Sequence, residues 1–309
     1  MNSETSTGYA HPSYAESFIQ LGSPRLLRQS GAWIVERQIP GSPHRDAMGC
    51  YPLFVCQNWT GLYADLESIG SKIVSLALVT DPFGEYDPAY LNQCFPEITK
   101  PFKLHFVIEL GRPVEQFITS HHRRNVDKSL AKVTVERCRH PEKFLDEWIT
   151  FYQTLAERHG INGITAFSRE SFVRQFSVPG LVAFRAVHQG AAVGMVLWYE
   201  HGNRAYYHLG AYSPLGYKLR ASFALFDFSI RYFADRKFQW LSLGAGTGID
   251  SHSNQQSGLT RFKSGWSTGT RIVYFCGRIF ERKKYQELVA ARCLPRTEYF
   301  PAYRAGEFN

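Results

Sequence analysis

Three consecutive β-strand patterns followed by one long apolar helix pattern constrain the fold of this chain most. The strand patterns are short and rich in β-branched and aromatic residues, and they cover residues 181–188, 192–200 and 204–212. The turns Gln189-Gly190 and His201-Gly202-Asn203 separate them, and connections this short predict antiparallel pairing between neighbours. Residues 217–237 then carry apolar side chains at helical spacing around most of their circumference, which predicts a largely buried helix packed on this sheet.

Further strand and helix patterns surround this block. Strands are predicted at 33–39, 51–56, 73–79, 104–110 and 239–243 and from residue 271, and helices at 60–69, 113–132, 141–159 and 168–176. The alternation predicts an α/β (α+β) fold with a mixed, mostly antiparallel sheet flanked by helices. For a chain of 309 residues we expect a poorly ordered lead-in (1–30), a reduced N-terminal unit (31–112) and a complete C-terminal unit (113–309).

The composition indicates the environment in which the chain works. Its 35 Lys and Arg residues exceed its 27 Asp and Glu residues, and the net charge of +8 favours anionic partners, although ordinary solubility explains the same charge. None of the six cysteines has C-x-x-C spacing, which favours reduced thiols over a disulfide framework or a zinc site. The first 24 residues lack the pattern of a signal peptide, and Gly and Pro interrupt the longest uncharged stretch, 47–64. We therefore expect a cytoplasmic protein with no membrane span and no metal site.

The start of the long helix has the features of an anion site. Its first turn holds Lys218 and Arg220 and no acidic residue, and Gly216 precedes it. Cations are unfavourable at the positive end of a helix dipole unless an anion binds there, and the free N–H groups of a helix start bind phosphate. Side chains that simply face solvent explain the same residues equally well. Gly216, Lys218 and Arg220 are therefore candidates for binding a donor phosphate.

The strand–strand–strand–helix–strand order resembles the core of the GNAT acyltransferase superfamily. That resemblance implies a third strand that diverges from the fifth, so that a backbone N–H is free to hold the carbonyl of an acyl donor. The usual CoA-binding loop of the superfamily, Q/R-x-x-G-x-G/A, is reduced here to one glycine in the segment 214–218. The resemblance therefore leaves the donor open between acyl-CoA and other acyl carriers.

The stretch Gly258-Leu259-Thr260-Arg261-Phe262-Lys263-Ser264-Gly265-Trp266 is the most distinctive in the chain. Together with Arg123-Arg124-x-x-x-Lys128 and the strand–helix block, it resembles the Fem family of peptidoglycan-bridge aminoacyltransferases, a GNAT branch built from two GNAT-like units. The likeness covers roughly residues 100–280. It implies transfer of an aminoacyl or related acyl group to an amine, often from aminoacyl-tRNA. It also implies that Phe262 and Arg261 contact substrate, and that Lys263 carries positive charge toward the reacting carbonyl or an acceptor phosphate.

Amide formation needs a positioned donor, a stabilised oxyanion and a deprotonated amine. Lys263 is the candidate oxyanion partner, although a lysine stem that covers neighbouring rings explains the same position. His208 in the third strand is the candidate base, with direct loss of the amine proton to water as the alternative. The other candidates are Tyr207 and Tyr212, the runner-up pair Asp250 and His252, and Asp81, which either enters a cleft between the units or starts a turn.

The sequence thus predicts an amide-forming acyltransferase, with its chemistry between the 204–220 region and the 250–266 loop. We expect aminoacyl-tRNA as the donor, a small-molecule or glycan-linked amine as the acceptor, and no tightly bound cofactor. One alternative is an N-acyltransferase that uses acyl-CoA or an acyl-carrier protein and modifies a sugar or small amine. The other is a binding module that keeps the fold without the chemistry.

Overall fold

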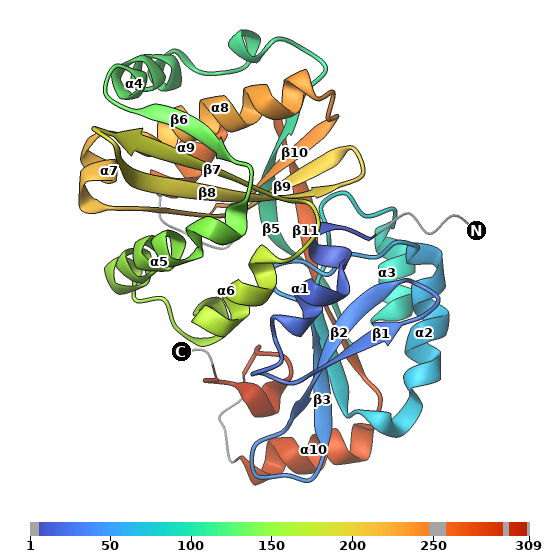
Figure 1. Ribbon diagram of the computed structural model, residues 1–309. Helices are drawn as coiled ribbons and strands as arrows, with labels where there is room; N and C mark the ends of the chain where they lie inside the picture. Colours follow the sequence, from blue (N-terminus) through green and yellow to red (C-terminus); the bar gives the residue numbers. More distant parts are fainter. Residues whose placement is uncertain (1–5, 247–257, 293–296, 308–309) are drawn as a thin grey trace. The chain divides into compact units, whose positions relative to one another are not determined.

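The computed structural model describes residues 6–246, 258–292 and 297–307, and the chain divides into two compact units (Figure 1). Unit 1 contains the residues up to Gly8, Lys103–Ile161 and Ser168–Ile272. Unit 2 contains Tyr9–Phe102, Asn162–Phe167 and the residues from Val273 onward. The chain therefore passes between the units several times, in contrast to the consecutive segments that the sequence led us to expect.

Unit 1 is built on a sheet with the strand order β5-β10-β9-β8-β7-β6. Its strands are β5 (Ile98–Glu109, of which the part from Lys103 belongs to unit 1), β6 (Thr134–Cys138), β7 (Leu181–His188), β8 (Ala191–His201), β9 (Arg204–Tyr212) and β10 (Trp240–Ala245). Neighbours run antiparallel except β9 and β10, which run parallel. The predicted meander is present as β7–β9, and the predicted fold class, a mixed and mostly antiparallel sheet flanked by helices, is confirmed.

Helices cover both faces of this sheet (Figure 1). On one face lie α4 (Ser120–Leu130), α8 (Ala221–Asp235) and α9 (Gly258–Ser264), and on the other lie α5 (Leu145–His159) and α6 (Arg169–Phe176). The core beneath the first group is rich in aromatic rings, among them Trp198, Phe226 and Trp266. These three side chains bury large apolar areas, so they hold α8 and α9 firmly on the sheet.

The predicted helix 217–237 is two helices in the structure. The short α7 (Pro214–Lys218) ends before Arg220, whose backbone is left-handed with φ of 60°, and α8 begins at the next residue. A single non-glycine residue in this conformation turns the chain out of one helix axis and into another. The predicted helix 113–132 likewise begins only at Ser120, because the chain after Pro113 makes a 3₁₀ turn and Thr119 then caps α4.

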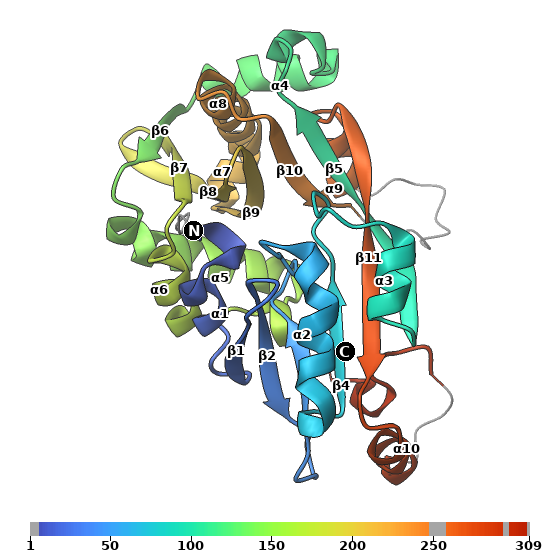
Figure 2. The same cartoon turned by 90° about the vertical axis from the view of Figure 1, so that its right-hand side faces the viewer.

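In unit 2 the sheet has the strand order β1-β2-β3-β4-β11. Its strands are β1 (Ser23–Leu27), β2 (Ala32–Gln38), β3 (Arg45–Gly49), β4 (Ser75–Val79) and β11 (Gly269–Ile279, of which the part from Val273 belongs to unit 2). Its helices are α1 (Pro12–Glu16), α2 (Leu62–Ile69), α3 (Pro88–Cys94) and α10 (Arg282–Ala291). Figure 2 shows α2 running alongside this sheet, where its apolar face joins the core of unit 2.

Two expectations for this region differ from the structure. The lead-in 1–30 was expected to be poorly ordered, but it contains α1 and β1, and β1 pairs with β2 along its whole length. The strand expected at 51–56 is reduced to a single bridge between Phe54 and Thr80, and the extended segment lies earlier, at β3. Short 3₁₀ turns complete the fold at Gly8–Ala10, Trp59–Gly61, Gly70–Lys72, Val114–Gln116, Pro141–Phe144, Gly163–Thr165 and Ala302–Arg304.

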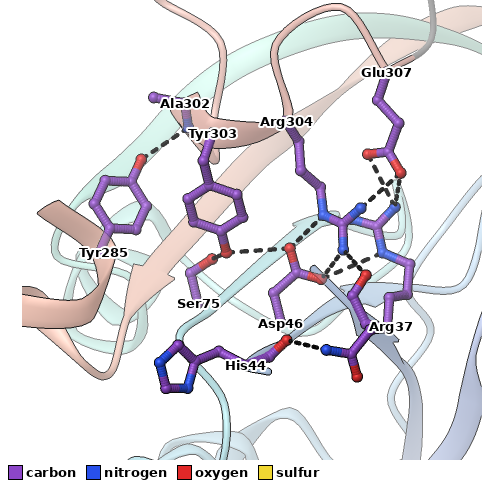
Figure 3. Close-up of polar contacts among 10 residues, drawn as sticks. Arg37, His44, Asp46, Ser75, Tyr285, Ala302, Tyr303, Arg304 and Glu307 are labelled. Atoms are coloured by element: carbon purple, nitrogen blue, oxygen red, sulfur yellow. Dashed lines mark hydrogen bonds and ion pairs between the residues drawn. The ribbon is translucent and has the colours of Figure 1, made fainter. Parts of the chain in front are cut away.

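The end of the chain belongs to unit 2 because a buried carboxylate holds it there (Figure 3). Asp46 of β3 is inaccessible to solvent, and it accepts hydrogen bonds from Arg304 Nη2 at 2.9 Å and from the Tyr303 hydroxyl at 3.1 Å. Arg37 of β2 lies 3.5 Å from the same carboxylate. A charge in a dry interior requires such partners, so these contacts fix the C-terminal segment on the sheet of unit 2.

Candidate active site

The candidate site in unit 1 begins where two strands separate. β9 pairs with β10 only from Arg204 to Tyr206, opposite Trp240 to Ser242. On its other side β9 pairs with β8, and the register there skips His208, because Leu197 faces Leu209 while Trp198 faces Tyr207. Such a bulge bends a strand and increases its twist. It therefore accounts for the divergence of β9 from β10, the feature that the GNAT resemblance implied.

Lys263 of α9 reaches the end of β10. Its side chain is only 6% exposed, and its Nζ donates a hydrogen bond of 2.6 Å to the Ala245 carbonyl oxygen. The same Nζ lies 5.8 Å from the centre of the Tyr207 ring. Burial, assisted by the charge of Lys103, lowers the pKa of Lys263 from 10.5 to about 7. Within the described ranges, no carboxylate pairs with this ammonium. Its neighbours there are the Ala245 carbonyl oxygen and the Tyr207 ring.

Two tyrosines predicted to bind substrate lie on the same side of β9 as Lys263. The hydroxyls of Tyr207 and Tyr212 are hydrogen-bonded to each other, and burial raises the pKa of each phenol, so both stay protonated at neutral pH. A Cβ on Gly210 would lie 2.4 Å from the Tyr207 hydroxyl and 3.0 Å from the Tyr212 hydroxyl. The two hydroxyls thus occupy the space above a strand position where only glycine fits.

His208 lies on the opposite side of β9. Its Nε2 is 3.0 Å from Oε1 of Gln175 on α6, and its ring packs 5.0 Å from that of Tyr199. Burial lowers the pKa of His208 to about 3. Tyr207, in contrast, packs against Phe226 of α8 at 4.9 Å. Because successive strand residues face opposite sides, the structure does not bring His208 together with Lys263.

The three candidate phosphate-binding residues differ in their surroundings. The N–H of Gly216 donates to the Ser213 hydroxyl, and a Cβ at Gly216 would lie 1.9 Å from the Val193 carbonyl oxygen, so close packing on β8 requires this glycine. Lys218 and Arg220 are exposed at the junction of α7 and α8. The Arg220 guanidinium donates to Oδ1 of Asn125, a buried residue of α4, which fixes the direction of this cation.

The remaining candidates from the sequence have varied positions. Phe262 packs between Phe223 and Phe226 of α8, at ring distances of 5.1 and 4.8 Å, whereas Arg261 is exposed on α9. Asp81 lies in unit 2 after β4, where its Oδ1 accepts the N–H of Phe83 at 3.0 Å, the geometry of a turn. Asp250 and His252 lie outside the described residues.

Sequence reasoning missed several groups near Lys263. One of them is Gly244 at the end of β10, whose backbone has a φ of 76°. A Cβ on this glycine would lie 3.1 Å from Lys263 Nζ. His105 of β5 is buried, with Nδ1 3.3 Å from the Ser242 hydroxyl and a pKa lowered to about 3 by burial and by the charges of Lys263 and Lys103. His122 of α4 is a further group of this kind, which the sequence did not single out. Among the described residues no group of three His, Cys, Asp or Glu side chains is placed to hold a metal ion.

The comparisons with known proteins define the class of this site. Residues 119–263 match the family model described as an acetyltransferase (GNAT) domain, a segment that runs from the cap of α4 to Lys263. The GNAT resemblance seen in the sequence is therefore confirmed, and this part of the chain is an acyltransferase domain. No curated protein matched the sequence. In the described part of the chain, no helix has both the length and the apolar character that crossing a membrane requires.

Several solved structures have a fold similar to that of most of this chain. The structure of FemX superposes with a TM-score of 0.67 at 14% identity, covering 90% of this chain and 93% of that one. The C-terminal domain of a putative lysylphosphatidylglycerol synthetase from Agrobacterium fabrum gives 0.61 at 12% identity, covering 90% and 91%. L-PGS from Bacillus licheniformis gives 0.54 at 13% identity, covering 93% and 98%.

Proposed function

We propose that this protein is an aminoacyltransferase that moves an aminoacyl group from aminoacyl-tRNA to an acceptor amine. The observation that carries the proposal is the buried Lys263 ammonium at the end of β10, beside the point where β9 and β10 separate. One of its three N–H bonds is directed to Ala245. Among the described residues the Ala245 carbonyl oxygen is the hydrogen-bond acceptor of this buried cation, and such a cation suits a carbonyl oxygen that gains negative charge.

The reaction follows from this placement. The acceptor nitrogen attacks the carbonyl carbon of the donor ester, and the oxygen of the tetrahedral intermediate takes up negative charge next to Lys263 Nζ. This attack forms the C–N bond, and the intermediate then collapses by re-forming the carbonyl while the C–O bond of the ester breaks. The nitrogen loses a proton to water, and the leaving ribose oxygen gains one. Tyr207 and Tyr212, both protonated, share one hydrogen bond, which leaves one O–H of the pair as a further donor on the same side of the strand.

The charged end of the donor is assigned to the junction of α7 and α8. Lys218 and Arg220 are exposed there, and Asn125 fixes the Arg220 guanidinium in place. The first N–H groups of α8 have no side-chain cap, so a phosphate can accept from them. A nucleic-acid donor would thus be held by its phosphate at one end of the site while its ester lies at Lys263.

Two of the superposed structures support an aminoacyl group, because their names refer to a lysylphosphatidylglycerol synthetase and to L-PGS. The alternative donor is acyl-CoA, which the description of the matched domain as an acetyltransferase favours. Both donors offer a phosphate to Lys218 and Arg220, so binding alone does not separate them. The two donors are distinguished by the chemical bond that is cleaved.

A donor assay separates these functions. The purified chain is incubated with tRNA charged with labelled amino acids, or with labelled acetyl-CoA, and with a panel of amino sugars, diamines and lysine-containing peptides. We expect label to move from tRNA to an amine, and we expect treatment of the tRNA with ribonuclease to abolish this transfer. Transfer from acetyl-CoA that ribonuclease leaves unchanged would overturn the tRNA proposal in favour of the N-acyltransferase.

Replacement of Lys263 tests the catalytic role itself. Loss of one oxyanion donor costs about 10² to 10³ in kcat in enzymes of this kind, so Lys263→Ala should lose activity on that scale. Leu259→Ala, at an exposed position on the same helix, serves as the comparison for α9 as a whole. Equal turnover by Lys263→Ala and the natural chain would remove Lys263 from the mechanism. A folded chain without turnover on any donor would favour the binding module.

A further inference from the structure

His122 of α4 connects two structural elements that meet next to Lys263. Its Nε2 lies 2.8 Å from the carbonyl oxygen of Phe262, and its Nδ1 lies 2.9 Å from the Thr119 hydroxyl. A carbonyl oxygen only accepts, so Nε2 carries the proton and Nδ1 accepts from Thr119. The imidazole is therefore neutral and has both nitrogens satisfied, and burial lowers its pKa in agreement with this state.

The bond to Phe262 satisfies the end of α9. This helix has only seven residues, and the last four carbonyl groups of a helix lack partners within it. His122 supplies one partner from α4, and the N–H of Thr119 supplies another by donating to the Gly265 carbonyl at 3.2 Å. The start of α4 thus caps the end of α9 at two points.

The space around the imidazole is built to receive it. A Cβ on Gly265 would lie 2.0 Å from Cε1 of His122, so the ring occupies the volume that any other residue at this position would fill. The edges of Trp266 and Phe223 close the remaining sides, at ring distances of 5.0 and 5.1 Å. These contacts therefore hold the His122 ring in one position. Its hydrogen bond holds the Phe262 carbonyl group in turn.

From these contacts we infer that His122 is a positioning residue, which fixes the last turn of α9 so that the Lys263 ammonium meets Ala245 at the separation of β9 and β10. Lys263 directly follows the capped carbonyl group, and its Nζ ends on Ala245 O. A catalytic effect of His122 rests on the proposed role of Lys263. The effect of His122 on the position of Lys263 does not depend on substrate.

The test therefore measures the lysine before it measures activity. Lys263 is titrated by NMR in the substrate-free chain with labelled lysine, in the natural sequence and in three variants. His122→Leu fills the space with an apolar side chain and removes the hydrogen-bond donor. His122→Gln keeps an N–H that can reach the Phe262 carbonyl. Val126→Ala weakens the same helix at a position away from α9. The groups that set the lysine's environment, Lys103, His105 and Tyr207, are unchanged in all of them, as is His121, the neighbour of His122 in the sequence.

We expect the pKa of Lys263, about 7 in the natural chain, to rise toward its ordinary value of 10.5 in His122→Leu and to stay near 7 in His122→Gln and Val126→Ala. In the donor assay His122→Leu should lose about 10² in kcat, as a displaced catalytic group does, with a similar KM for the donor. A folded His122→Leu chain with an unshifted lysine would overturn the inference. Should that variant not fold, Thr119→Val, which removes the partner of Nδ1 together with the side-chain cap of α4, must shift the lysine in the same direction or the inference fails. A shifted lysine without any transfer activity would instead contradict the proposed function and leave the positioning role intact.

Discussion

The Nζ atom of Lys263 lies over Gly244, so close that a β-carbon on this glycine would stand 3.1 Å from it. Gly244 has a left-handed backbone with φ of 76°, and the β5–β10 register shifts at this point. The bulge therefore turns the end of β10 so that Ala245 presents its carbonyl oxygen to the lysine. Two separate properties of one glycine, its backbone and its missing side chain, shape the candidate site.

Gly244→Ala should lower stability and activity together. The left-handed backbone costs about 1 kcal/mol for alanine, and the new methyl group requires Nζ to shift by a few tenths of an ångström from its position at Ala245. Gly190 is the matched control, because its φ is 81° and a Cβ there meets nothing within 4 Å. Denaturant unfolding should show a similar loss for Gly190→Ala, and the donor assay should show a loss of about tenfold or more for Gly244→Ala alone. Equal activities of the two variants would contradict the role of Gly244 at the lysine.

The stability of the chain should depend on Lys263 between pH 7 and 10.5. The pKa of this group is about 7 in the folded chain and 10.5 in the reference state, so in this window the unfolded chain binds more protons. Stability then rises with pH, by up to about 1.4 kcal/mol per pH unit. The measurement is the difference in unfolding free energy between the natural chain and Lys263→Met, in which all other titrations cancel. The unfolding free energy of the natural chain should increase relative to that of Lys263→Met from pH 7.5 to 9.5. A difference between the two that does not change with pH would show that Lys263 titrates normally.

Arg220→Gly should separate backbone strain from donor binding. Glycine adopts a φ of 60° without the penalty of a side chain, which offsets the lost hydrogen bond to the buried Asn125, so the stability should change by no more than about 1 kcal/mol. It should nevertheless bind tRNA more weakly, and the salt dependence of binding should fall by about one unit of slope for the lost phosphate contact. Lys237→Gly removes a cation with φ of 61° just after α8. If this control weakens tRNA binding as much, Arg220 has no special place in the donor site.

Asp46→Asn should destabilise unit 2 strongly. The substitution leaves Arg37 and Arg304 in the interior without their counter-charge, and breaking a buried ion pair in this way costs about 3–5 kcal/mol. Glu67→Gln removes the partner of Arg278 at a site where the carboxylate is half exposed, and such pairs contribute about 0–1 kcal/mol. Unfolding in urea gives both values. Similar losses for the two variants would mean that the Asp46 cluster does not anchor the C-terminal segment.

The sequence was most informative where structure is local. Tight turns at Gly190 and Gly202 bring β7, β8 and β9 together without any distant contact, which is why the meander could be predicted strand by strand. The sequence also marked Arg220 as a candidate, because cations at a helix start are unusual in themselves, whereas Lys263 became a candidate through the resemblance of its stretch to the Fem family. Each of these signals lies within a few residues of the feature that it predicts.

The tertiary structure decided what these residues do. Which face of β9 presents His208 depends on a bulge that only pairing with β8 creates, and Asn125, 95 positions away along the chain, directs Arg220. The burial that lowers the pKa of Lys263 likewise comes from residues far apart in sequence. Spacing and turn residues fixed the order of the strands, because those preferences act between neighbours in the chain. The electrostatics of the site arise from groups that become neighbours only after folding, so no local pattern contains them.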